Sequence, residues 1–194
     1  FSHIVKNLRL VDNEKNKGKG GVVKQGMLEA RGDYRLFMDA DNSTTVDQFE
    51  NMIPYFREGY DVVIGSRDVK GAELHPAQPF YKRILGNAGN IFIQVLLLPG
   101  IWDTQCGFKC FTGAAAKKVF PLQRINGWGF DVEILTLSKA LGCRTKEIPV
   151  VWVNDLRSQV KLSAYIKVLA ETMKVRLWLW RDAYKIKSSK VANN

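Results

Sequence analysis

Two aspartates, Asp39 and Asp41, directly follow a short apolar run at residues 34–38. Such a run predicts a strand, and ligands of α/β proteins bind where strands end. Two carboxylates at this spacing suit Mg²⁺ or Mn²⁺, which complete their coordination with phosphate oxygens and water. The alternative interpretation is a solvated turn, because an Asp-x-Asp pair often occurs by chance.

Two further segments could bind anions near the aspartates. Residues 16–21 read NKGKGG ahead of a helical pattern, so backbone N–H groups and two lysines could meet an anion at a helix N-terminus. This segment does not match the P-loop spacing. Gly65-Ser66-Arg67 follows a second apolar run, residues 61–64, and places a guanidinium near the same edge. A surface turn with a solvated arginine is the alternative there.

The elements that must position these residues alternate between apolar runs and helical periodicity, which indicates an α/β chain. We expect strands at 34–38, 61–64 and 145–153, and helices at 20–30, 46–56, 82–98, 130–141 and 163–184. Only the short segment 4–11 precedes the first helix, so we expect one or two leading strands of such a sheet to be missing. The expected domains are a catalytic domain at 1–160 and a basic amphipathic helix with its tail at 161–194.

Composition and charge restrict the class of protein. The chain has 194 residues, is 46% hydrophobic and carries a formal net charge of +10. Residues 1–24 hold six basic and two acidic side chains, and residues 161–194 hold eight and two, so both ends are basic. No nucleic-acid-binding motif accompanies this charge, and we expect no nucleic-acid partner. Three cysteines and two histidines without metal-site spacing predict reduced thiols rather than disulfides or zinc.

Five segments taken together resemble glycosyltransferase family 2, and within it the synthases of polyprenyl- and dolichyl-phosphate sugars. They are residues 16–20, 39–41, 65–67, 103–109 and 128–133, and the resemblance covers residues 7–180. It implies a Rossmann-like GT-A fold, in which a mixed sheet is flanked by helices. It also implies a nucleotide-sugar donor, a divalent metal, and transfer with inversion to a lipid phosphate.

The resemblance assigns roles to particular residues. Asp39 and Asp41 fall on the metal motif and count as catalytic, together with Asp103 and Gln105. Some relatives have a glutamine as a further metal contact where this chain has Ser43, so we expect a weaker ligand or water there. The donor-binding candidates are Lys17, Gly18, Lys19, Gly20, Asp39 and Asp41.

The acceptor phosphate needs cations but no general base, because a phosphate monoester is largely doubly ionised at neutral pH. The candidates are Arg67, Arg83, Asn87, Arg157 and Lys161. The pair Arg83 and Asn87 is implied by the resemblance, and a solvated helix start is its alternative. In the acceptor loop, Gln159 follows Ser158 where relatives have a lysine, so Arg157 and Lys161 rest on charge alone. Asp131 and Glu133 lie at a helix start, where capping competes with a site role.

The final helix carries an apolar stripe flanked by basic residues, which suits either a membrane interface or core packing. The stripe consists of Leu162, Tyr165, Ile166, Leu169, Met173, Leu177, Trp180 and Tyr184, and the basic residues are Lys167, Lys174, Arg176 and Arg181. No apolar stretch is long enough to span a membrane. We therefore expect a peripheral protein on the cytosolic side of a membrane.

The resemblance thus predicts transfer of a hexose, glucose from UDP-glucose, to dolichyl or polyprenyl phosphate, assisted by Mg²⁺ or Mn²⁺. Three alternatives stay open. They are a GDP-mannose-dependent mannosyltransferase, a soluble family 2 transferase with a non-lipid acceptor, and an inactive truncated relative. Because the leading strands hold the nucleobase in the family, we expect residues 1–194 alone to lack turnover, and robust activity would contradict this.

Overall fold

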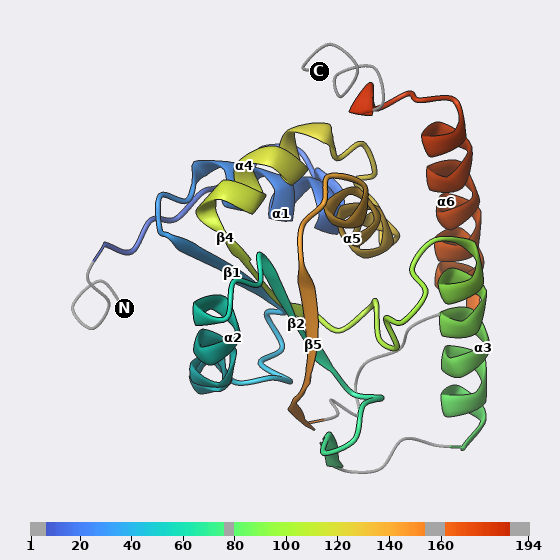
Figure 1. The fold of residues 1–194 in the computed structure, drawn as a ribbon, viewed down its shortest axis with the longest axis horizontal. Helices are drawn as coiled ribbons and strands as arrows, with labels where there is room; N and C mark the ends of the chain where they lie inside the picture. The colour runs from blue at the N-terminus through green and yellow to red at the C-terminus, as the bar shows by residue number, and fades with distance from the viewer. Residues whose placement is uncertain (1–6, 76–79, 154–161, 187–194) are drawn as a thin grey trace.

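The computed structural model describes residues 7–75, 80–153 and 162–186, which form a mixed α/β architecture (Figure 1). The predicted α/β class is therefore confirmed. The elements in chain order are α1 (Gly18–Glu29), β1 (Tyr34–Met38), η1 (Val46–Met52), α2 (Ile53–Arg57), β2 (Val62–Ser66), β3 (Glu73–His75), α3 (Phe80–Leu96), β4 (Phe108–Thr112), α4 (Gly113–Val119), η2 (Phe120–Leu122), α5 (Phe130–Ala140), β5 (Thr145–Pro149), β6 (Val151–Val153) and α6 (Leu162–Trp180).

Four strands form the main sheet in the order β1-β4-β2-β5, and β3 pairs with β6 in a separate small sheet. Strand β4 is antiparallel to both β1 and β2, whereas β2 and β5 are parallel. Met38 pairs with Phe108, so the end of β1 and the beginning of β4 lie at one edge. The residues after β1 and those before β4 therefore meet there.

Alternate side chains of the strands enter two separate cores. Val62, Ile64 and Phe111 face the core beneath α1, α4 and α5, whereas Val63 and Cys110 face the core beneath η1 and α2. Figure 1 shows these helices on opposite sides of the sheet. The sheet is thereby covered on both faces, and its polar edge is the place left for ligands.

The predicted elements agree with the structure except at three places. The expected strand 145–153 divides at Val150, whose N–H still donates to Ser66 of β2 while its carbonyl oxygen accepts from Glu73 of β3, and its second half pairs with β3. The expected helix 46–56 begins as the 3₁₀ helix η1. The final helix ends at Trp180, because Asp182 and Lys185 take positive φ angles of 48° and 57°.

Candidate active site

The carboxylates of Asp39 and Asp41 follow β1 at the polar edge of the sheet. The backbone N–H of Asp39 donates to the carbonyl oxygen of Gly107 at 2.9 Å. The chain then turns, because the Asp41 carboxylate accepts from the N–H of Ser43 at 3.0 Å. Asp41 is exposed, and the side chain of Asp39 is 35% exposed. Both carboxylates are therefore open to solvent at this edge.

Lys19 brings the glycine-rich segment to the aspartates. Its Nζ lies 2.6 Å from Oδ1 of Asp39, and 5.1 Å from the centre of the Trp128 ring. Trp128 is 49% exposed, so this corner of the site presents an aromatic face beside a cation and a carboxylate. Segments separated by about a hundred residues in the chain thus meet here, as the sequence motifs suggested.

The glycines of the segment serve close packing. A Cβ on Gly18, whose φ is +72°, would overlap the carbonyl oxygen of Asn126, and the N–H of Gly20 donates to the same oxygen at 2.9 Å. Lys17 turns away along α1, where its Nζ donates to Gln25 at 2.8 Å. Of the four predicted donor-binding residues at positions 17–20, Lys19 is therefore the one whose side chain reaches Asp39.

Gly107 gives Asp39 its position, because a Cβ at residue 107 would overlap the Asp39 carboxylate. We expect Gly107→Ala to displace that carboxylate and to lower the sugar transfer that the family resemblance implies by about 100-fold, the loss of a few kcal/mol of positioning. Steady-state rates measure this, with Gly142→Ala as a control for a glycine whose Cβ would meet nothing within 4 Å. Since Gly142 has a φ of +79°, that control carries backbone strain without any contact to the site. Equal activity of Gly107→Ala and wild type would show that Asp39 needs no such placement.

Behind this edge, Lys109 and Asp131 form a buried ion pair. Lys109 Nζ lies 2.6 Å from Oδ1 of Asp131, and their side chains are 0% and 2% exposed. The ammonium also donates to the carbonyl oxygen of Cys106, which fixes the segment leading to Gly107. Burial raises the pKa of Asp131, while the charges of Lys109 and Lys19 oppose that rise. The pair is a structural support for the site, and its members have no access to solvent.

Arg67 and Asp103 form a second ion pair, and it changes the interpretation of both residues. The guanidinium donates to both carboxylate oxygens of Asp103, at 2.7 and 2.9 Å, and the Arg67 backbone N–H donates to the same group at 3.0 Å. Burial alone would raise the pKa of Asp103, but Arg67 lowers it to about 2. Asp103 is fully buried. Asp103 thus orients Arg67, whose guanidinium is already paired, and the site roles predicted for both residues stay predictions.

Gln105 differs from Asp103 because its side-chain amide nitrogen is buried and has no hydrogen-bond partner among the described residues. The hydroxyl of Ser43 is also buried, and no hydrogen-bond partner for it lies in the described part of the chain. A buried polar atom without a partner costs about 1–3 kcal/mol. Both groups therefore have unused hydrogen-bonding capacity close to the segments that carry Asp39, Asp41 and Gly107.

The predicted acceptor residues are only partly placed. Arg83 and Asn87 lie on α3, where the structure describes the backbone and not these side chains. Arg157 and Lys161 lie outside the described residues. The contact of these four residues with a phosphate stays a prediction.

Asp131 and Glu133, at the start of α5, bind other segments instead of capping their own helix. The Glu133 carboxylate accepts from the backbone N–H groups of Arg124 and Ile125 and from the hydroxyl of Tyr184. Tyr184 is 4% exposed, so it belongs to the core and not to the predicted apolar stripe. Glu133 thus ties the segment that follows α6 to the domain.

The two aspartates fit part of a divalent-metal site. Within the described ranges, no group of three or more His, Cys, Asp or Glu side chains could hold a metal. Mg²⁺ is commonly bound by one or two carboxylates together with substrate phosphates. The accessible pair Asp39 and Asp41, with Lys19 to neutralise a diphosphate, matches that pattern and requires the donor to complete the coordination.

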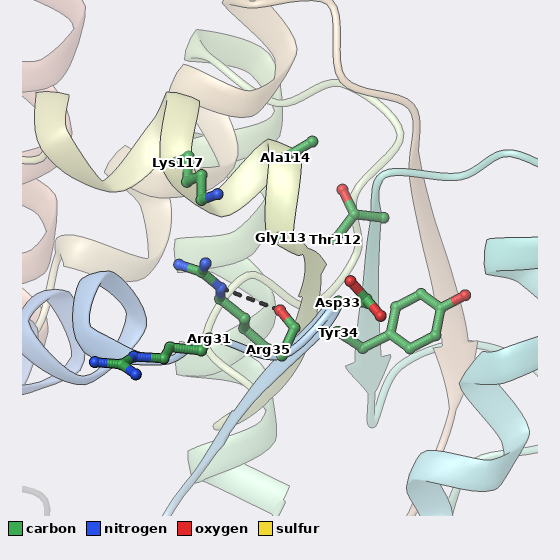
Figure 2. Close-up of a pocket in the computed structure, with 9 residues that line it drawn as sticks. Arg31, Asp33, Tyr34, Arg35, Thr112, Gly113, Ala114 and Lys117 are labelled. Atoms are coloured by element: carbon green, nitrogen blue, oxygen red, sulfur yellow. Dashed lines mark hydrogen bonds between the residues drawn. The ribbon is translucent and has the colours of Figure 1, made fainter.

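A hollow of about 500 Å³ lies elsewhere, near the start of β1 (Figure 2). The buried guanidinium of Arg35 donates to the carbonyl oxygens of Met27 and Gly32 there. The lining residues are Arg31, Gly32, Asp33, Tyr34, Arg35, Thr112, Gly113, Ala114 and Lys117. None of them belongs to the predicted site, which is an open edge and not this hollow.

Helices α3 and α6 contact each other (Figure 1). Both helices expose apolar side chains. The exposed members of the predicted stripe on α6 are Ile166, Met173, Leu177 and Trp180. The exposed apolar residues of α3 are Ile91, Phe92 and Val95. We call these seven residues the α3/α6 apolar surface. In the part of the chain that is described, no helix is long and apolar enough to cross a membrane.

The three cysteines are free thiols, as predicted. Burial raises the pKa of Cys106 and of Cys110 to about 12, which suppresses the reactive thiolate at pH 8. We therefore expect iodoacetamide to label the half-buried Cys143 in the native protein and all three cysteines after unfolding. Peptide mass spectrometry measures the labelling, and native labelling of Cys106 as fast as that of Cys143 would contradict the burial.

Comparisons with known proteins show the family of the chain. The family model described as Glycosyl transferase family 2 matches residues 2–120. The dolichyl-phosphate beta-glucosyltransferase of Dictyostelium discoideum is 37% identical over 188 residues, which cover 94% of this chain and 58% of that protein. The protein of that name from Saccharomyces cerevisiae is 33% identical over 194 residues, covering 91% of this chain and 58% of its own length. The chain thus spans a little over half the length of these curated relatives.

Solved structures support the fold. The crystal structure of glucosyl-3-phosphoglycerate synthase from M. tuberculosis matches with a TM-score of 0.56 at 16% identity, covering 90% of this chain and 59% of the other. The same enzyme in complex with UDP matches with a TM-score of 0.57 at 13% identity, with the same coverage. The predicted GT-A class, a mixed sheet flanked by helices, is confirmed by this likeness.

Proposed function

The chain belongs to glycosyl transferase family 2, and from that premise we propose that it transfers glucose from UDP-glucose to dolichyl phosphate. The observation that carries the proposal is the open edge at which Lys19 pairs with Asp39 and the exposed Asp41 follows two residues further along the chain. The names of the similar proteins support the sugar and the acceptor, and UDP in the structural neighbour supports the nucleotide.

In this proposal Asp39 and Asp41 hold Mg²⁺ or Mn²⁺, and Lys19 binds the donor diphosphate. The metal, when bound, supplies positive charge that stabilises the leaving nucleoside diphosphate. The acceptor phosphate is already ionised, so its oxygen attacks the anomeric carbon without a protein base, and the configuration inverts. Arg83 and Asn87 on α3 bind that phosphate. The exposed ring of Trp128 contacts the bound donor.

We also place the protein at the cytosolic surface of a membrane through the α3/α6 apolar surface. Exposed apolar groups flanked by Lys167, Lys174, Arg176 and Arg181 suit an interface with anionic lipid, worth roughly 1 kcal/mol per basic residue. The free thiols agree with a reducing compartment.

A vesicle experiment checks the membrane contact. We expect Met173→Glu with Trp180→Glu to weaken binding to phosphatidylserine-containing vesicles by at least about 10-fold, because both exposed side chains leave the interface. Val22→Glu is the matched control, since Val22 is 48% exposed on α1. Co-sedimentation measures binding, and an equal loss in the control would show that added negative charge alone is responsible.

The activity itself is tested with the full-length protein. UDP-glucose, UDP-galactose, GDP-mannose and GDP-glucose are each incubated with dolichyl phosphate and Mg²⁺ or Mn²⁺, and lipid-linked sugar is extracted and identified. The proposal expects glucosyl lipid from UDP-glucose and its loss with EDTA. Mannosyl lipid from GDP-mannose would replace the proposed donor, and absence of any lipid product with all donors would overturn the acceptor.

A further inference from the structure

A carboxylate from α6 occupies a space made by two glycines beside the candidate site. Oε2 of Glu171 accepts from the backbone N–H of Gly129 at 2.7 Å. A Cβ on Gly127 would lie 2.6 Å from Oε1 of Glu171, and one on Gly129 would lie 2.6 Å from Oε2. Any side chain at either position would therefore push the carboxylate out. The segment Gly127–Gly129, which we call the glycine bridge, is shaped to receive Glu171.

The charge of Glu171 suits its place. Gly129 is the residue that precedes α5, and it offers no side chain to cap that helix. A negative charge at a helix N-terminus interacts favourably with the helix dipole and with the unpaired backbone N–H groups there. Glu171 supplies this charge from another helix, 42 residues further along the chain.

The glycine bridge also touches the donor side of the site. Trp128, its middle residue, lies against the Lys19 ammonium, which pairs with Asp39. Asn126, the residue just before the glycine bridge, accepts a hydrogen bond through its carbonyl oxygen from the N–H of Gly20. One short segment thus joins α6 to the start of α1 and to the first aspartate of the site.

We infer that Glu171 is a positioning residue, which holds the glycine bridge so that Trp128 and Lys19 stay in place for the donor diphosphate. This inference rests on the proposed function and assigns a residue outside the site motifs to donor binding. Since α6 also carries the α3/α6 apolar surface, the same carboxylate connects the membrane-facing helix to the donor side of the site.

The test compares Glu171→Ala, Glu171→Gln and the control Glu50→Ala, an exposed glutamate of η1. We expect Glu171→Ala to raise the KM for the nucleotide sugar about 10-fold with a smaller change in kcat, since the hydrogen bond from Gly129 to a charged carboxylate is lost. In Glu171→Gln the side-chain oxygen still accepts from Gly129, so KM should stay within about threefold of wild type. Glu50→Ala should match wild type.

Hydrogen exchange at Gly129 separates this inference from the proposed function, because it needs no turnover. Faster exchange of the Gly129 amide in Glu171→Ala, at least about 10-fold, is expected even if the sugar or the acceptor is different. A double-mutant cycle with Trp128→Ala should show that the two effects on KM are not additive. Faster exchange with an unchanged KM, or fully additive effects, would overturn the positioning role. Unchanged exchange would show that the bridge does not depend on Glu171.

Discussion

Under the proposed function, Asp41→Ala should lower glucosyl transfer by about 1,000-fold, because the metal proposed to stabilise the leaving diphosphate would contribute several kcal/mol to the transition state. Asp41 is exposed, and its carboxylate accepts from the backbone N–H of Ser43, so its loss should change stability little. Initial rates of lipid-linked glucose formation at saturating donor measure the effect, with thermal unfolding recorded for the same samples.

Asp47→Ala is the matched control, because Asp47 is also an exposed aspartate in the segment that follows β1. It should retain activity within about twofold of wild type, as surface substitutions away from a site do. Asp39→Asn should be as impaired as Asp41→Ala, and it also removes the charge that pairs with Lys19. An Asp41→Ala protein with near wild-type rates would remove the aspartate pair from the mechanism.

Lys109→Met should be the most destabilising single substitution that we propose. It leaves the Asp131 carboxylate buried without its cation, and removing one partner of a buried pair costs about 3–5 kcal/mol. Urea unfolding followed by circular dichroism measures the free energy of unfolding. A loss below about 1 kcal/mol would show that the pair is solvated or replaceable.

Two controls connect this loss to the ion pair. Lys109→Met combined with Asp131→Leu should recover most of the stability, because an apolar pair leaves no buried charge. Lowering the pH should also reduce the deficit of Lys109→Met. Burial raises the pKa of Asp131, and removing Lys109 raises it further. The folded variant then takes up a proton at a higher pH than the unfolded chain does, so its stability falls as pH rises through that pKa.

The parts of the fold that the sequence predicts are those with strong periodicity. Residues 34–38 and 61–64 are purely local apolar runs, and they are strands in the structure. Strand β4 is not predicted by its residues, because it contains Lys109, and only the folded chain brings Asp131 from a distant helix to neutralise that charge. The short helix α4, at seven residues, has too few turns for a periodic signal.

The candidate site shows the same division between local and distant information. The motif at 39–41 and the lysine at 19 could be found because their residue types are unusual next to an apolar run and a glycine segment. The pairing of Arg67 with Asp103 could not be predicted, because the two residues are 36 positions apart and each follows a pattern that is also typical of a ligand-binding residue. No sequence pattern indicates a role for Glu171, since only the folded chain brings its carboxylate to the backbone N–H of Gly129.

The central claim is that Asp39 and Asp41 hold a divalent metal together with the diphosphate of a uridine nucleotide. Calorimetric titration of the full-length protein with UDP, in Mn²⁺ or in EDTA, tests it most directly. We predict that UDP binds in Mn²⁺, and that EDTA or Asp41→Ala weakens binding by at least about 100-fold, as expected for losing a metal–phosphate contact worth several kcal/mol. UDP binding of equal strength in EDTA and in Asp41→Ala would contradict the account.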